Sequence, residues 1–169
     1  MATAAGLVLL QPVQAATLTD QETQALHDAA GAKQRATKER LKTLSSAQIA
    51  DALRENLSDV TKIIFQKGYG VFVEYTAADG QDRMWFPGNT GVIRGIWGVR
   101  DRNGRPTACF HYLKSVNAVT GEFESTECVP PEQTLGESVV IEKRHGDVFN
   151  LLSDRIPYRK APLDVPAWP

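Results

Sequence analysis

The chain has 169 residues, of which 42% are hydrophobic and 23% charged, a composition typical of one ordinary globular domain. The formal net charge is -1, from 19 Lys and Arg against 20 Asp and Glu. The electrostatic field of such a protein is too weak to attract nucleic acid or an anionic membrane surface. We therefore expect no nucleic acid among its partners.

Residues 1–16 have the pattern of a secretory leader. An apolar run from Ala4 to Leu10 precedes a small-x-small cleavage pattern at Val13-Gln14-Ala15, although the first lysine is Lys33 and a basic segment is missing. No run approaches the ~20 apolar residues of a membrane span, so we expect no transmembrane segment. The prediction is a periplasmic or secreted protein; the alternative is that these residues are only a disordered apolar leader.

Two capping boxes predict two N-terminal helices. Thr19-Asp20-Gln21-Glu22 and Ser45-Ser46-Ala47-Gln48 each place a hydroxyl residue three positions before Glu or Gln, the arrangement that satisfies early helical amides. The first helix has a weak apolar stripe, which is typical of a solvated helix. The second carries Ile49 and Leu53 at helical spacing, and we expect it to end at Asn56 and to pack on a sheet.

A β-meander follows, and Asp79-Gly80 marks its first clear hairpin. As a two-residue turn, this pair fixes which residues lie opposite each other. The predicted pairs are Tyr75 with Met84 and Val73 with Phe86 on one face, and Glu74 with Trp85 and Thr76 with Arg83 on the other.

Asn103-Gly104 marks the second hairpin in the same way. It predicts an aromatic face, with Gly95 leaving room for the ring of the residue opposite. The predicted pairs are Trp97 with Phe110, Val99 with Ala108, and Gly95 with Tyr112.

The two cysteines, Cys109 and Cys128, set the register of the third hairpin. Direct opposition gives the Cα separation that a disulfide requires, and such a bridge contributes ~3 kcal/mol on the loop-entropy model. It also places Phe123 on the aromatic face. A zinc site would lack most of its ligands, but His111, two residues from Cys109, keeps a metal or redox role open as the minor alternative.

The remaining segments complete an α+β fold. We expect a last hairpin from strands at 138–143 and 148–152, and a proline-rich strap over 156–169 anchored by Trp168. The predicted architecture is a single domain over 17–155, with N-terminal helices followed by an antiparallel meander of about seven strands, curled into a half-barrel.

One face of this meander is the candidate ligand site. The predicted registers place Glu74, Arg83, Trp85, Arg94 and His111 together, on the side away from the aromatic core. If the sheet curls, this face lines a cleft with the mixed chemistry of small-ligand sites. If it stays open, the same face packs under the N-terminal helices.

The β region also carries several carboxylates that could in principle supply the acid/base pair of a glycoside hydrolase, or could be edge and turn charges. They are Glu74, Asp79, Asp82, Glu122, Glu124 and Glu127. No nucleophile elbow, zinc-hydrolase helix or phosphate-binding loop is present in the sequence, so we assign no catalytic residue and expect no metal and no cofactor.

Four short segments carry a family resemblance: residues 44–49 (LSSAQI), 70–80 (GVFVEYTAADG), 95–99 (GIWGV) and 109–112 (CFHY). In this order they are similar to the DUF995-like group, small exported proteobacterial proteins of unknown function. The resemblance covers roughly residues 44–129 and implies a periplasmic β-rich domain with one disulfide. It implies no catalytic residue. The Gly-x-Trp segment also resembles lipocalins, but there it lies on the first strand.

The function expected from the sequence is that of an exported, non-enzymatic binding or envelope-associated protein, whose partner is a small molecule, a glycan or a protein. One alternative is a hydrolase acting on cell-wall or glycan material. Another is an inhibitor or interaction protein acting through an exposed loop, for which residues 114–122 are the best candidate.

Overall fold

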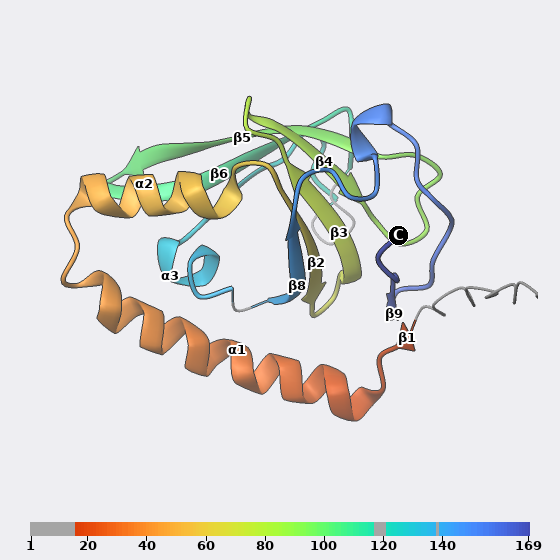
Figure 1. The fold of residues 1–169 in the computed structure, drawn as a ribbon, viewed down its shortest axis with the longest axis horizontal. Coiled ribbons are helices and arrows are strands. Elements are labelled where there is room, and N and C mark those ends of the chain that lie inside the picture. Colours follow the sequence, from red (N-terminus) through yellow and green to blue (C-terminus); the bar gives the residue numbers. More distant parts are fainter. Residues whose placement is uncertain (1–15, 117–120, 138) are drawn as a thin grey trace, which may run out of the picture.

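The computed structural model describes residues 16–116, 121–137 and 139–169 (Figure 1). Nearly all of the expected leader and the centre of the 114–122 loop lie outside these ranges. Within them, the predicted fold class is confirmed: two N-terminal helices precede a seven-stranded antiparallel sheet that curls into a half-barrel.

Both N-terminal helices begin at the predicted capping boxes. Helix α1 (Asp20–Leu41) is capped by Thr19, and helix α2 (Ser46–Leu57) is capped by Ser45 and ends one residue later than expected. Helix α1 buries little beyond its C-terminal end and runs along the outside of the molecule (Figure 1). Helix α2 buries an apolar stripe spaced by four residues, so it packs closely on the sheet.

The seven strands form one sheet in the order β7-β6-β5-β4-β3-β2-β8. Six of them follow the chain as a meander, and β8 returns to pair with β2. A short pair, β1 (Ala16–Thr17) with β9 (Asp164–Val165), joins the two ends of the described chain. The strands of the large sheet are β2 (Val60–Gln66), β3 (Gly70–Thr76), β4 (Gln81–Trp85), β5 (Ile93–Arg102), β6 (Arg105–Leu113), β7 (Thr126–Val129) and β8 (Val140–His145).

The predicted register of the β3–β4 hairpin is wrong by one residue. Glu74 lies opposite Met84, and Trp85 lies opposite Val73. The connection holds three residues: the amide of Ala77 donates to the carbonyl of Gln81, and Gly80 adopts a left-handed φ of 89°. This is the longer hairpin loop in which glycine follows a tight turn. Because side chains alternate, the slip moves Glu74 to the face opposite Trp85.

The β5–β6 hairpin has the predicted register, with Trp97 opposite Phe110 and Gly95 opposite Tyr112. Asn103 and Gly104 both have positive φ, as a two-residue turn of this type requires. The predicted disulfide is also confirmed: Cys109 and Cys128 are bonded and lie directly opposite each other on β6 and β7.

Phe123 does not join the aromatic face, contrary to the predicted register. It pairs with Val116 in an isolated bridge and is 62% exposed. Lys114 and Glu124 both adopt left-handed φ, which ends the regular β6–β7 pairing before Phe123.

The expected last hairpin is also wrong. Strand β8 pairs with β2, and the second expected strand contains a turn of 3-10 helix, η1 (Leu151–Ser153). The cause is Asp147, whose carboxylate accepts hydrogen bonds from the amides of Leu151 and Leu152 at 2.7 and 2.8 Å. These bonds fold the chain back on itself, as Asx turns do.

The two faces of the sheet are covered by different parts of the chain. The outer face of β2, β3 and β4 packs under η1 and the C-terminal segment, where Trp85 is fully buried and Trp168 stacks on Phe149 with ring centroids 5.2 Å apart. The expected anchoring by Trp168 is confirmed. The inner face of β5 and β6 packs under α2, through Leu53 and Phe110 among others.

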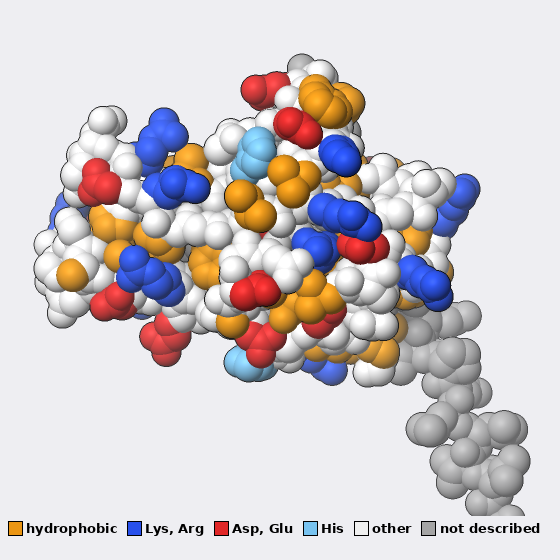
Figure 2. Space-filling model, turned by 90° about the horizontal axis from the view of Figure 1, so that it is seen from above, with side chains coloured by type: hydrophobic (Ala, Val, Ile, Leu, Met, Phe, Trp, Pro, Cys, Tyr) orange, Lys and Arg blue, Asp and Glu red, His pale blue; other side chains and the backbone are white. Residues whose placement is uncertain are grey.

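The side of the molecule at the top of Figure 1, where β5 lies, carries no continuous apolar surface. Figure 2 shows hydrophobic side chains in small groups separated by charged ones.

Candidate functional site

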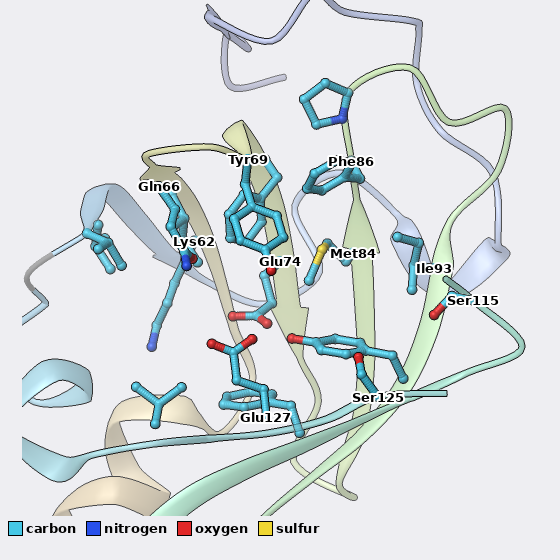
Figure 3. Close-up of a pocket in the computed structure, with 18 of the residues that line it drawn as sticks. Lys62, Gln66, Tyr69, Glu74, Met84, Phe86, Ile93, Ser115, Ser125 and Glu127 are labelled. Atoms are coloured by element: carbon cyan, nitrogen blue, oxygen red, sulfur yellow. The ribbon is translucent and has the colours of Figure 1, made fainter. Parts of the chain in front are cut away.

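The half-barrel encloses a cavity of about 240 Å³ on its inner face (Figure 3). Helix α2 covers only the β5–β6 part of this face, which leaves space above β2, β3 and β4. The walls are mainly apolar and come from most strands of the sheet. Their apolar residues include Ile64, Phe72, Met84, Phe86, Ile93, Tyr112, Val139 and Val140.

Two carboxylates meet inside this cavity. Glu74 of β3 and Glu127 of β7 point toward each other from opposite walls (Figure 3). Three strands separate β3 from β7 in the sheet order, so only the curl of the half-barrel brings the two side chains together. A flat sheet with the same register would keep them apart.

Glu74 is buried, with 7% of its surface exposed. Within the described ranges, no hydrogen bond or ion pair reaches its carboxylate. Lys62 is the nearest cation on the adjacent strand, but its Nζ donates to Asn56 Oδ1 at 3.0 Å. Asn56 in turn donates to Glu137, which pairs with Lys143. The ammonium of Lys62 is thus held by a polar network at the edge of the cavity.

This environment changes the proton affinity of the carboxylates. Burial raises the pKa of Glu74 to about 7, with a further rise from Glu127 that Lys62 partly offsets. Burial also raises the pKa of Glu127. Glu74 is therefore partly protonated near neutral pH, and burial favours the protonated form of Glu127 as well.

Two more polar groups lie behind the pair. Asp82 is fully buried, and neither of its carboxyl oxygens has a hydrogen-bond partner among the described residues. Burial, together with Glu74, raises its pKa well above the usual range. Burial and the same carboxylates raise the pKa of Tyr112, which lines the cavity. Tyr112 is therefore neutral at pH 7, and the burial of Asp82 favours its protonated form.

The structure does not bring the five predicted ligand-binding residues together. Trp85 is buried in the outer core, on the face opposite Glu74. Arg83 and Arg94 lie on that outer side, where Arg83 Nε is 3.1 Å and Arg94 Nη2 is 2.7 Å from the carboxylate of Asp154. His111 lies farther along, half-exposed, with Nδ1 2.9 Å from Thr126 Oγ1. The expectation of one shared face is wrong for Glu74, which the one-residue slip of the first hairpin moves to the inner face. The other four residues stay on the outer face but in separate surroundings.

Three of the six predicted carboxylates do cluster: Glu74, Asp82 and Glu127. Asp79 instead caps its own turn through Gln81, and Glu124 accepts the amide of Lys114. The sequence signal for the cluster is a charged residue within an apolar strand, as in Gly70–Thr76 and in Val60–Gln66, which contains Lys62. Buried charges in such strands face either a partner or a cavity.

The described residues, those of the cavity walls included, contain no group of three or more His, Cys, Asp and Glu side chains placed to hold a metal ion. None of the helices in the described ranges combines the length and the apolar character that crossing a bilayer requires.

Comparison of the chain with protein-family models, with curated proteins and with solved structures finds no significant match. Similarity to the DUF995-like group therefore stays a prediction.

Proposed function

We propose that this chain is an exported binding protein that holds a small, largely apolar molecule inside its half-barrel. The observation that carries the proposal is the interior cavity of about 240 Å³ with apolar walls and two carboxylates. Ligand sites are concave and mostly apolar, with a few placed polar groups that orient the ligand. The cavity has this composition.

The disulfide supports the export part of the proposal. Cys109 and Cys128 are the only cysteines of the chain, and both are used in the bridge. Disulfides persist in oxidising compartments such as the periplasm or the extracellular space. The leader pattern predicted from residues 1–16 agrees with the same location.

Binding of N-phenyl-1-naphthylamine, an uncharged dye that fluoresces in apolar surroundings, tests the proposal. We expect saturable 1:1 binding that Ile93→Trp weakens at least tenfold, because Ile93 lines the cavity. Ile96→Trp is the matched control on the same strand, since Ile96 is 46% exposed and points to the outer side. Absence of binding, or equal loss in both variants, would overturn the proposal.

The facing carboxylates favour one second candidate, a hydrolase acting on cell-wall or glycan material. Glycoside hydrolysis uses two carboxyl groups, one of them protonated at working pH, and a pKa of about 7 gives Glu74 that property. Release of reducing ends from peptidoglycan by the wild type, abolished in both Glu74→Gln and Glu127→Gln, would establish this function. No release by the wild type would eliminate it.

A further inference from the structure

We propose that the ligand of the cavity is an organic cation, an apolar body that carries an ammonium group, and that Glu74 together with Glu127 is its counter-ion site. This inference rests on the proposed binding function and adds the chemical class of the ligand.

The carboxylate of Glu74 is buried and has no direct partner among the described residues. It points into the cavity, toward Glu127, and accepts no hydrogen bond or ion pair from those residues (Figure 3). A buried carboxylate without a partner is costly, and native proteins rarely keep one unless it serves a function. The carboxylate of Glu74 can therefore accept a hydrogen bond from a donor inside the cavity.

Lys62 stabilises the charge of Glu74 from the neighbouring strand but makes no direct contact with its carboxylate. Lys62 is the only described Lys or Arg that lines the cavity, and its Nζ is held by Asn56. No ion pair within 4 Å joins Lys62 to Glu74 in the described part of the chain. The Asn56–Glu137–Lys143 network fixes this arrangement from the side of α2 and β8. The space between Glu74 and Glu127 is left for an external donor.

An ammonium group is the donor that best fits this site. Two carboxylates suit an ammonium group, which offers several N–H donors and forms strong, charge-assisted hydrogen bonds. Aromatic walls, among them Phe72 and Phe86, are compatible with a cation and with an apolar body attached to it. A hard metal ion needs about six oxygen ligands, and the described walls supply too few.

The binding of an ammonium ligand to these carboxylates should depend on pH. The charged and titratable groups around Glu74 are Lys62 on β2, Asp82 on β4, Tyr112 on β6 and Glu127 on β7, with Lys143 of β8 acting through Lys62. Burial favours the neutral forms of Asp82 and Tyr112, and Lys62 donates its hydrogen bond to Asn56. An ammonium ligand therefore competes with protons for Glu74 and Glu127.

Displacement of N-phenyl-1-naphthylamine by three molecules of similar size tests the inference: hexylammonium, 1-hexanol and hexanoate. We expect hexylammonium to bind about tenfold more tightly than 1-hexanol at pH 8, and hexanoate to bind most weakly. The preference should shrink as the pH falls from 8 to 5.5, because protonation removes the carboxylate charge. The affinity for 1-hexanol should stay constant.

Glu74→Gln and Glu127→Gln should each reduce the preference for hexylammonium severalfold while dye binding persists. Glu55→Gln, on the exposed side of α2, is the matched control and should leave the preference unchanged. Dye binding without a preference for hexylammonium would overturn the cation inference and leave the proposed function intact. Loss of dye binding in the wild type would overturn the proposed function itself. A preference that survives both variants would also overturn the inference.

Discussion

Gly95 of β5 lies directly opposite Asp82 of β4, and the carboxyl group of Asp82 occupies the space that a side chain at position 95 would need. A Cβ at Gly95 would lie 2.9 Å from Asp82 Oδ2 and 3.0 Å from the carbonyl oxygen of His111. It would also lie 3.3 Å from the Tyr112 ring, for which the sequence predicted that Gly95 leaves room. The packing of Asp82 and Tyr112 around position 95 thus requires a residue without a side chain.

Gly95→Ala should lower the free energy of unfolding by about 1–3 kcal/mol, because a backbone carbonyl and a buried carboxyl group must both move. Gly98→Ala, three residues along the same strand, is the matched control. A Cβ there meets nothing within 4 Å, so we expect a change within about 0.5 kcal/mol or a slight gain. Urea unfolding of both variants measures the difference; equal effects would contradict the packing described for Gly95.

The raised pKa of Glu74 predicts a pH-dependent stability. The folded protein binds the Glu74 proton more tightly than the unfolded chain, whose pKa is near 4.5. The resulting stabilisation is complete below pH 4.5 and is lost as the pH rises through about 7, with an upper limit of about 3 kcal/mol. The free energy of unfolding should therefore fall between pH 5.5 and 8, and Glu74→Gln should reduce this fall.

Urea unfolding at pH 5.5 and pH 8 measures this dependence, and Glu55→Gln is again the control because Glu55 is exposed. Asp82 and Glu127 also have raised pKa values and contribute with the same sign, so part of the fall should remain in Glu74→Gln. The same pH dependence in the wild type and in Glu74→Gln would show that Glu74 titrates alike in the folded and unfolded states.

Asp154 bridges Arg83 and Arg94 on the outer side, and the side chain of Arg83 is only 12% exposed. Asp154→Asn keeps a residue that tolerates the left-handed φ of 60° but removes the charge. We expect a loss of about 1–2 kcal/mol, because a mostly buried guanidinium loses an anionic acceptor. Asp51→Asn breaks a similar but exposed pair with Arg54 and should cost less than about 0.5 kcal/mol.

Removal of the disulfide should destabilise the β6–β7 edge. Cys109 and Cys128 close a loop of 19 positions, so the Cys109→Ser/Cys128→Ser double variant should lose about 3 kcal/mol. Thermal unfolding with and without dithiothreitol checks this, since the reductant should shift the wild type and leave the double variant unchanged. A reductant effect on the double variant would exclude the disulfide as its cause.

Much of the fold could be predicted from local patterns. The two capping boxes, the Asn103-Gly104 turn and the cysteine pair each act over a few residues, and the structure confirms all of them. The register predicted from Asp79-Gly80 was wrong because glycine also occurs in three-residue hairpin loops, where it takes the last position. A single residue of loop length decided which face Glu74 occupies.

The candidate site was predicted in part. Glu74 and Glu127 were both among the carboxylates considered, but their pairing was not expected. They belong to strands that are not neighbours in the sheet, so no hairpin register relates them. Lys62 was missed, although a lysine within the apolar segment Val60–Gln66 signals a buried charge. The face predicted for the ligand is instead divided between an outer core and an exposed ion-pair cluster.

The sequence by itself determined many elements of this protein: where its two N-terminal helices begin, the meander order of six strands and the covalent link between β6 and β7. These features follow from contacts between residues close in the chain or from one unique cysteine pair. Only the tertiary structure decided that α2 covers part of the inner face of the curled sheet, and that Glu74 and Glu127 share a buried cavity. The physical reason is that the side chains buried together on one face depend on the packing of the whole chain, which no local pattern specifies.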